Sequence, residues 1–300
     1  MEQVLITGGT GLVGKTITTL LKDQGYKVLY LSTRPDKSAD IPRYGWNVAK
    51  QELDSQAFEG TDHIIHLAGA GVADKRWTSS RKKELYDSRI EGTKLIHKAL
   101  KEGGFKPKSF LAASAVGFYG DRGSELMNEE AAAGCNFLAM ICKDWEAESA
   151  KIADLGIRTT INRIGIVLAN EGGALPEMMK TAPLGFLAYL GSGKQYYPWI
   201  HLKDLARIFV HQLQNENSSG IYNAVGKEPV TNYELTKAIA RYSSKSYAVL
   251  PTPAFTLRIV LGEMADMVLA SQKTSSEKLL SSGFSYEFED LEAALKDLLA

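Results

Sequence analysis

The sequence predicts an α/β fold, in which a doubly wound parallel sheet carries helices on both faces and is followed by a small, mainly helical C-terminal lobe. This prediction rests on the order of patterns along the chain. A short apolar strand runs into a glycine turn and then a helical pattern over residues 4–21. Strand and helix patterns alternate as far as residue 168. After Ala169 the rhythm breaks, and Gly, Pro and aromatic residues accumulate.

The glycine turn over residues 4–14, V-L-I-T-G-G-T-G-L-V-G, predicts a nucleotide-binding site. Gly8, Gly11 and Gly14 allow a sharp turn, close approach of a pyrophosphate and tight packing of a helix on the sheet. The phosphates would contact the free amides at the positive end of that helix. The alternative is a strand-turn-helix with a purely structural role, because a glycine triplet alone is a weak signal.

Composition narrows the class of protein. The 300 residues carry equal numbers of acidic and basic side chains, so no charge excess favours nucleic acid or an anionic membrane. The two cysteines, Cys135 and Cys142, fit neither a disulfide framework nor a zinc site. No apolar run reaches membrane-spanning length, and the first core strand leaves no room for a signal peptide. We therefore expect a cytoplasmic protein without a metal, a membrane or a nucleic-acid partner. Oligomeric state is not predicted.

The other elements follow from the spacing of apolar residues. We expect further strands at 27–31, 62–67, 109–113, 158–168 and 221–225, and helices at 80–102, 137–155, 202–213 and 232–242, the last capped by Asn232. Residues 170–197 indicate a loop with one short helix, and the tail 251–300 indicates helical segments interrupted by Gly262 and Gly283.

This pattern predicts a division into two units. The larger unit, residues 1–168 plus about 198–226, would be the nucleotide-binding domain. The smaller one, residues 169–197 plus 227–300, would form the substrate or capping lobe. It would cover the carboxyl edge of the sheet, where open α/β folds bind ligands.

The end of the second strand indicates the cofactor. An NAD site usually has an acidic residue there, which holds the ribose 2′-hydroxyl. This chain has Ser32, Thr33 and Arg34 instead, so hydroxyls and a guanidinium could hold a 2′-phosphate. Asp36 lies two residues further on and could mislead. The sequence favours NADP(H), and the alternative for Arg34 is a solvated side chain at a strand end.

Several segments together resemble the extended short-chain dehydrogenases. Residues 7–14 match the fingerprint T-G-x-x-G-x-x-G, and Leu67-Ala68-Gly69 resembles the turn beneath the adenosine. Residues 114–120, S-A-V-G-F-Y-G, resemble the active-site serine strand. The segments 73–78, 87–89, 144–146 and 261–266 are similar to one atypical branch. That branch is the nucleoside-diphosphate-sugar-epimerase-like family with a C-terminal domain of unknown function of the DUF1731 type.

The resemblance covers essentially the whole chain and implies a Rossmann fold that binds NADP(H). It also implies cofactor contacts, to which Arg89 would contribute at a phosphate and Glu84 at a ribose or ring group. The alternative for both is a salt bridge on the surface of the long helix. The residues assigned to the cofactor are Gly8, Thr10, Gly11, Leu12, Val13, Ser32, Thr33, Arg34, Leu67, Ala68, Gly69, Glu84, Arg89 and Ile166.

The family's usual proton-transfer pair is not found where it is expected. Short-chain dehydrogenases use Tyr-x-x-x-Lys, in which the lysine favours the phenolate. Counting back from Glu146 puts Leu138 at the tyrosine position and Cys142 at the lysine position. Lys143 is one residue late and points about 100° around the helix. A true Y-x-x-x-K at Tyr233 lies in the wrong segment and indicates a chance match.

Two functions remain open. The first is an NADP(H)-dependent oxidoreductase or epimerase-like enzyme for an unidentified small polar substrate, which could be a nucleotide sugar. In it Ser114 would orient a carbonyl beside the nicotinamide, unless this hydroxyl is satisfied by backbone. The second is a catalytically silent NADP(H) sensor or regulatory protein, favoured by the loss of both proton-handling residues. Cys142 is either a thiol beside the cofactor or a small core residue.

Overall fold

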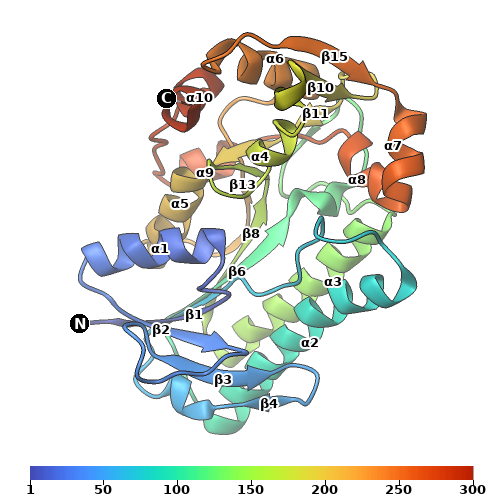
Figure 1. Cartoon of the computed structure of the whole chain (residues 1–300). Helices are drawn as coiled ribbons and strands as arrows, with labels where there is room; N and C mark the ends of the chain where they lie inside the picture. Colours follow the sequence, from blue (N-terminus) through green and yellow to red (C-terminus); the bar gives the residue numbers. More distant parts are fainter. Residues whose placement is uncertain (300) are drawn as a thin grey trace.

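A computed structural model describes residues 1–299 and contains a large eight-stranded sheet with helices on both faces (Figure 1). Neighbouring strands pair in parallel, except β3 and β4 at one edge. The predicted fold class is confirmed. In spatial order the strands are β13 (Gly220–Ala224), β8 (Arg158–Ile164), β6 (Ser109–Ala115), β5 (His63–His66), β1 (Gln3–Thr7), β2 (Lys27–Ser32), β3 (Arg43–Asn47) and β4 (Glu52–Leu53).

The order of the strands reverses direction at β1, which lies between β2 and β5. Open α/β sheets bind ligands at such a switch point, outside the carboxyl ends of the strands. The helices are α1 (Leu12–Asp23), α2 (Ser79–Gly103), α3 (Phe137–Ala150), α4 (Leu175–Met178), α5 (Leu202–Gln214), α6 (Asn232–Tyr242), α7 (Ala254–Leu261), α8 (Ala265–Leu269), α9 (Glu277–Ser281) and α10 (Leu291–Leu299).

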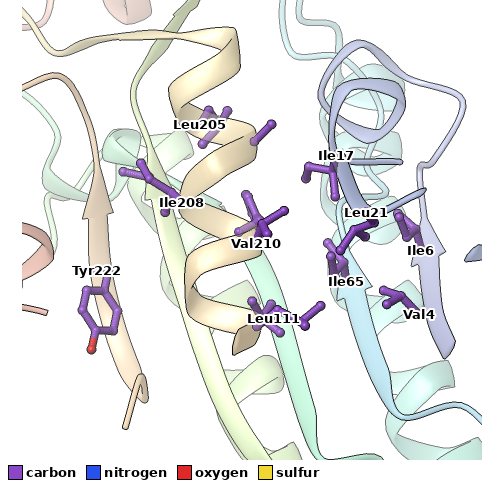
Figure 2. Close-up of a cluster of buried hydrophobic side chains, with 14 of the residues drawn as sticks. Val4, Ile6, Ile17, Leu21, Ile65, Leu111, Leu205, Ile208, Val210 and Tyr222 are labelled. Carbon is purple, nitrogen blue, oxygen red and sulfur yellow. The ribbon is translucent and has the colours of Figure 1, made fainter. Parts of the chain in front are cut away.

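Side chains of β1 alternate between the two faces of the sheet. Val4 and Ile6 pack in a cluster with α1 and α5, and Figure 2 shows Ile17 and Leu21 of α1 beside them. Leu5 packs in a second cluster with α2. Both faces of the central strands are therefore buried, as a parallel sheet requires.

A further cluster joins β9 (Ile166–Leu168) and β12 (Trp199–His201) to α4, α6 and α10. Because β9 follows directly on β8, this cluster lies over the carboxyl end of that strand. It includes Leu187 of β10 (Phe186–Leu190), and β10 pairs with β15 (Ala248–Thr252). The remaining short pairs are β11 (Tyr196–Tyr197) with β14 (Val230–Thr231) and β7 (Leu126–Met127) with β16 (Lys273–Thr274).

The predicted strand 158–168 is wrong as one element, because it breaks at Gly165. β8 pairs with β6 and β13, whereas β9 leaves the sheet and pairs with β12. The break is fixed by two backbone bonds, from the Gly165 amide to Ala224 (3.1 Å) and from the Ile166 amide to Pro198 (2.7 Å). A Cβ at Gly165 would collide with the Pro198 carbonyl oxygen.

Other boundaries also differ from the prediction. The sequence analysis missed β3 and β4, and also β10 and β11, which lie in the predicted loop 170–197. In β3 only Tyr44 and Trp46 alternate with other residues, and β4 has two residues. The helix predicted at 137–155 is α-helical to Ala150 and continues as a 3₁₀ turn. Thr231, not Asn232, caps α6, in a capping box with Glu234. Ala300, the last residue of the predicted lobe, lies outside the described residues.

The close approach at Gly165 can be tested with Gly165→Ala. We expect this variant to lose about 1–3 kcal/mol of unfolding free energy, because the added methyl group forces the strand junction apart. Urea titration measures the loss. Gly45→Ala in β3 is the matched control, since its Cβ would lie 3.6 Å from the nearest atoms, an ordinary contact. Equal stabilities of the two variants would contradict the account of the junction.

Candidate cofactor and active site

The turn between β1 and α1 is shaped by close backbone contacts that only glycine permits. Gly8 has a φ of +72°, and its carbonyl accepts from the Gly11 amide at 3.0 Å. A Cβ at Gly14 would lie 2.5 Å from the Gly8 oxygen. Gly11 is the N-cap of α1 and offers no side-chain cap. The first amides of α1 therefore remain available, which fits the binding of a phosphate group.

A pocket of about 400 Å³ lies beside this turn, at the carboxyl ends of β1 and β2. Its walls include six of the predicted residues: Gly8, Thr10, Ser32, Thr33, Ala68 and Gly69. The other lining residues are Gly9, Tyr30, Leu31, Trp46, Asn47, Val48, Ala49 and Ser88. Residues 46–49 escaped the sequence analysis because β3 was not recognised as a strand. The apolar and aromatic side chains of this lining, together with the hydroxyls of Ser32 and Thr33, fit an adenosine moiety.

The pocket wall at residues 67–68 is held by the Thr7 hydroxyl. This oxygen accepts from the amides of Leu67 (3.2 Å) and Ala68 (3.1 Å), so its own proton goes to His66 Nδ1 at 2.7 Å. His66 Nε2 then donates to Thr93 Oγ1 at 3.0 Å. Burial lowers the pKa of His66 to about 3, which keeps the ring neutral, and the two hydrogen bonds set its tautomer.

Arg89 lies half-buried against the same turn. A Cβ at Gly69 would come within 3.0 Å of the Arg89 Cζ. The guanidinium covers the Trp145 ring at 5.2 Å and donates to the Leu85 carbonyl at 3.1 Å. Burial lowers its pKa, and within residues 1–299 no ion pair is formed by this side chain. A cation held there without an acidic partner fits an anionic group of a ligand.

Glu84 is placed differently. Its exposed carboxylate pairs with Arg81 Nη1 at 2.7 Å, which matches the salt-bridge alternative for this residue. A contact with the cofactor remains a prediction. Of the other predicted residues, Leu12 and Val13 form the first turn of α1, Arg34 is exposed next to Thr33, and Ile166 begins β9.

Ser114 is one end of a buried polar network at the end of β6. Its hydroxyl donates to Glu146 Oε1 at 2.6 Å, and Arg163 holds both oxygens of that carboxylate, at 2.9 and 2.8 Å. Arg163 Nη1 also donates to the Tyr119 hydroxyl at 2.9 Å. Tyr119 in turn donates to Asn223 Oδ1 at 2.6 Å. The Ser114 hydroxyl is therefore satisfied by a side chain, not by backbone, and its oxygen keeps the capacity to accept.

Two other groups near Ser114 are poor proton donors at neutral pH. Burial, reinforced by the charge of Glu146, raises the pKa of Cys142 to about 11. Burial also raises the pKa of Tyr119. A Cβ at Gly117 would lie 3.4 Å from Leu138 Cβ and 3.9 Å from Cys142 Sγ, so the residues counted to the pair positions face the segment that follows the serine.

Lys143 and the Tyr233–Lys237 motif lie away from this network. Lys143 is exposed on α3. Tyr233 packs edge-on against Tyr189 of β10, and Lys237 is exposed on α6. Nothing in their placement brings them to Ser114. Among residues 1–299, no group of three or more His, Cys, Asp or Glu side chains is arranged to hold a metal, and no helix has the length and apolar character needed to cross a bilayer.

Comparison with known proteins decides the family. The model of the NAD dependent epimerase/dehydratase family matches residues 4–225, and the model of the domain of unknown function DUF1731 matches residues 252–298. The chain belongs to the NAD-dependent epimerase/dehydratase family. The resemblance seen in the sequence is confirmed, and the chain is an NAD(P)-binding member of this family.

Its relatives match over nearly their whole length. An epimerase family protein of Mycobacterium leprae is 33% identical, covering 97% of this chain and 94% of the relative. The mouse epimerase family protein SDR39U1 is 32% identical, covering 99% and 100%. The human SDR39U1, solved with NADPH, superposes with a TM-score of 0.88 at 30% identity, covering 99% of each chain.

The neutral His66 predicts how stability depends on pH. Its folded-state pKa of about 3 lies below the value near 6.5 expected when unfolded, so between these values the unfolded chain binds the extra proton. Stability is therefore lost as pH falls below about 6.5, by up to about 1.4 kcal/mol per pH unit from this group. Denaturant titrations between pH 7 and 5 measure the slope.

The His66→Asn variant should have a shallower slope than the wild type. The slope that remains comes from His63, His201 and His211, whose pKa values burial also lowers. An unchanged slope in His66→Asn would show that the ring is not held neutral.

Proposed function

We propose that this chain binds NADP(H) and acts as an epimerase-like oxidoreductase on a small polar substrate, for which nucleotide sugars are the first class to test. The observation that carries the cofactor assignment is the uncapped amino end of α1 beside a pocket that ends in Ser32 and Thr33. Arg34 lies next to these hydroxyls without an acidic partner in residues 1–299. The human relative with NADPH supports the same assignment.

The catalytic assignment rests on Ser114. Bound NADPH would supply a hydride, and the protein would position the acceptor carbon. Ser114 lies at the carboxyl end of β6, near Cys142 and on the same side of the sheet as Arg89. The Ser114 hydroxyl donates its hydrogen bond to Glu146. Ser114 would therefore accept a hydrogen bond from a substrate hydroxyl, or donate one to a carbonyl after its bond to Glu146 breaks.

The division into two units supports a place for the substrate. We propose that residues 169–197 plus 227–300 form the lobe that covers the carboxyl edge of the larger unit. Lys82 at the start of α2 pairs with Glu263 after α7, which ties the lobe to the nucleotide-binding part. Both cysteines are free in the structure, which suits the reducing cytoplasm that we propose for this protein.

The second candidate is a catalytically silent NADP(H) sensor. The observation that favours it is that the polar groups around Ser114 are already hydrogen-bonded to one another. The serine proton is held by Glu146, and the pKa of Cys142 is about 11, so neither group is ready to exchange a proton near pH 7.

The cofactor assignment is tested by titrating the purified protein with NADPH and with NADH. We expect NADPH to bind more tightly. Arg34→Ala should weaken NADPH by about 2 kcal/mol, roughly thirtyfold, because a charge-assisted bond to the 2′-phosphate is lost. Arg241→Ala, an exposed arginine on α6, is the control. Equal affinities for the two cofactors, or no loss in Arg34→Ala, would overturn the assignment.

The choice between enzyme and sensor is tested by following NADPH oxidation with a panel of carbonyl compounds and sugar nucleotides. We expect turnover with at least one member of the panel. In Ser114→Ala the turnover should fall by about two orders of magnitude, while NADPH affinity stays within a factor of about two. Tight NADPH binding without turnover across the panel would favour the sensor.

A further inference from the structure

Asp36 comes four residues after Ser32, the last residue of β2, and an NAD site usually carries its ribose-binding acid at the end of this strand. Both carboxylate oxygens of Asp36 are occupied within the protein. Oδ1 accepts from the Ser38 amide at 3.1 Å and from the Ser38 hydroxyl at 2.8 Å. Oδ2 accepts from Arg43 Nη2 at 2.9 Å. The hydrogen bonds from Ser38 have the largest effect, and together with the charge of Arg43 they hold the pKa of Asp36 below its usual range. The carboxylate is therefore charged and already satisfied.

Arg43 binds Asp36 through both its backbone and its side chain. It is the first residue of β3, and its backbone forms two bonds with Asp36: the Asp36 amide donates to the Arg43 carbonyl (2.9 Å) and the Arg43 amide to the Asp36 carbonyl (3.0 Å). Within residues 1–299 the only hydrogen bond of the guanidinium goes to Asp36, and the buried Nε has no partner. The backbone bonds keep the segment after β2 in place whichever side chain stands at position 43.

Of the other charged side chains in residues 32–38, Lys37 is paired and Arg34 is exposed. Lys37 pairs with Asp54 at 2.9 Å. With Asp36 neutralised by Arg43, Arg34 is the charged side chain of residues 32–38 without an ionic partner in the described chain. The segment therefore presents hydroxyls and a positive charge beside the pocket, and its one carboxylate is turned into an internal ion pair.

We propose that Arg43, assisted by Ser38, is a specificity-determining residue that masks Asp36 and so makes this site select a 2′-phosphorylated dinucleotide over the unphosphorylated one. The inference rests on the proposed NADP(H) binding. An unmasked Asp36 would repel the 2′-phosphate and could accept from a free ribose 2′-hydroxyl. The mask thus acts against NAD(H), in addition to the attraction that Arg34 provides.

The test is the pair of dissociation constants for NADPH and NADH in Arg43→Met, measured by fluorescence titration. Methionine keeps the apolar length of the side chain and removes the charge. We expect NADPH to bind about tenfold more weakly, because the exposed Asp36 carboxylate would repel the 2′-phosphate. We expect NADH to bind about threefold more tightly, because the same carboxylate could accept a hydrogen bond from the ribose 2′-hydroxyl. The NADPH loss should shrink as salt is raised.

The double variant Asp36→Asn/Arg43→Met separates masking from the mere loss of a positive charge. It lacks both charges, so NADPH affinity should return to within about threefold of wild type and the gain in NADH affinity should disappear. Thermal melts of both variants check that they are folded. If NADH binds Arg43→Met no better than wild type, or if the double variant stays as weak for NADPH as the single one, the masking proposal is wrong.

The affinities of the wild-type protein distinguish failure of the masking proposal from failure of the proposed NADP(H) binding. A wild type without preference for NADPH overturns the proposed cofactor, and the masking with it. A wild type that prefers NADPH, together with an Arg43→Met variant whose preference is unchanged, overturns the masking alone.

Discussion

The Thr7 hydroxyl joins the carboxyl ends of β1 and β5, and the cofactor-binding half of the molecule depends on that junction. The Thr7 hydroxyl oxygen accepts hydrogen bonds from the amides of Leu67 and Ala68, and the hydroxyl donates one to His66. The same chain of bonds continues through Thr93 to the Arg89 carbonyl on α2. The glycine turn, the turn at residues 67–69 and the helix that carries Arg89 are thus held in one arrangement, at the point where the strand order reverses.

A second buried network surrounds Ser114, at the end of β6. The ion pair of Glu146 and Arg163 joins α3 to β8, and Ser114 and Tyr119 bind to its two ends. Breaking such a buried pair typically costs about 3–5 kcal/mol, since an uncompensated charge is left behind. The network therefore fixes the geometry around Ser114 firmly. The Ser114 hydroxyl donates its hydrogen bond to this network, so it is not a free donor as an unpaired serine would be.

Much of the fold was predictable because its central elements carry strong local signals. β1, β2, β5 and β6 are apolar runs, and α1 and α5 bury one apolar face, so periodicity placed them within a few residues. The strands β3 and β4 were missed because they are short: two aromatic residues alternate in β3, and β4 has only two residues. The break at Gly165 was missed for another reason. It depends on Pro198 and Ala224, which are distant in sequence.

The sequence by itself determined the glycine turn, the hydroxyls and arginine after β2, and the family, because each is encoded in residues adjacent along the chain. Only the tertiary structure decided what the isolated polar residues do. In the sequence Glu146 served only as the reference position for locating the Tyr-x-x-x-Lys pair, whereas in the fold it accepts a hydrogen bond from Ser114. Asp36 could be mistaken in the sequence for the ribose-binding acid of an NAD site, and in the fold it is bound by Arg43. A side chain's chemistry depends on its partners, and here those partners come from elements that only folding brings together.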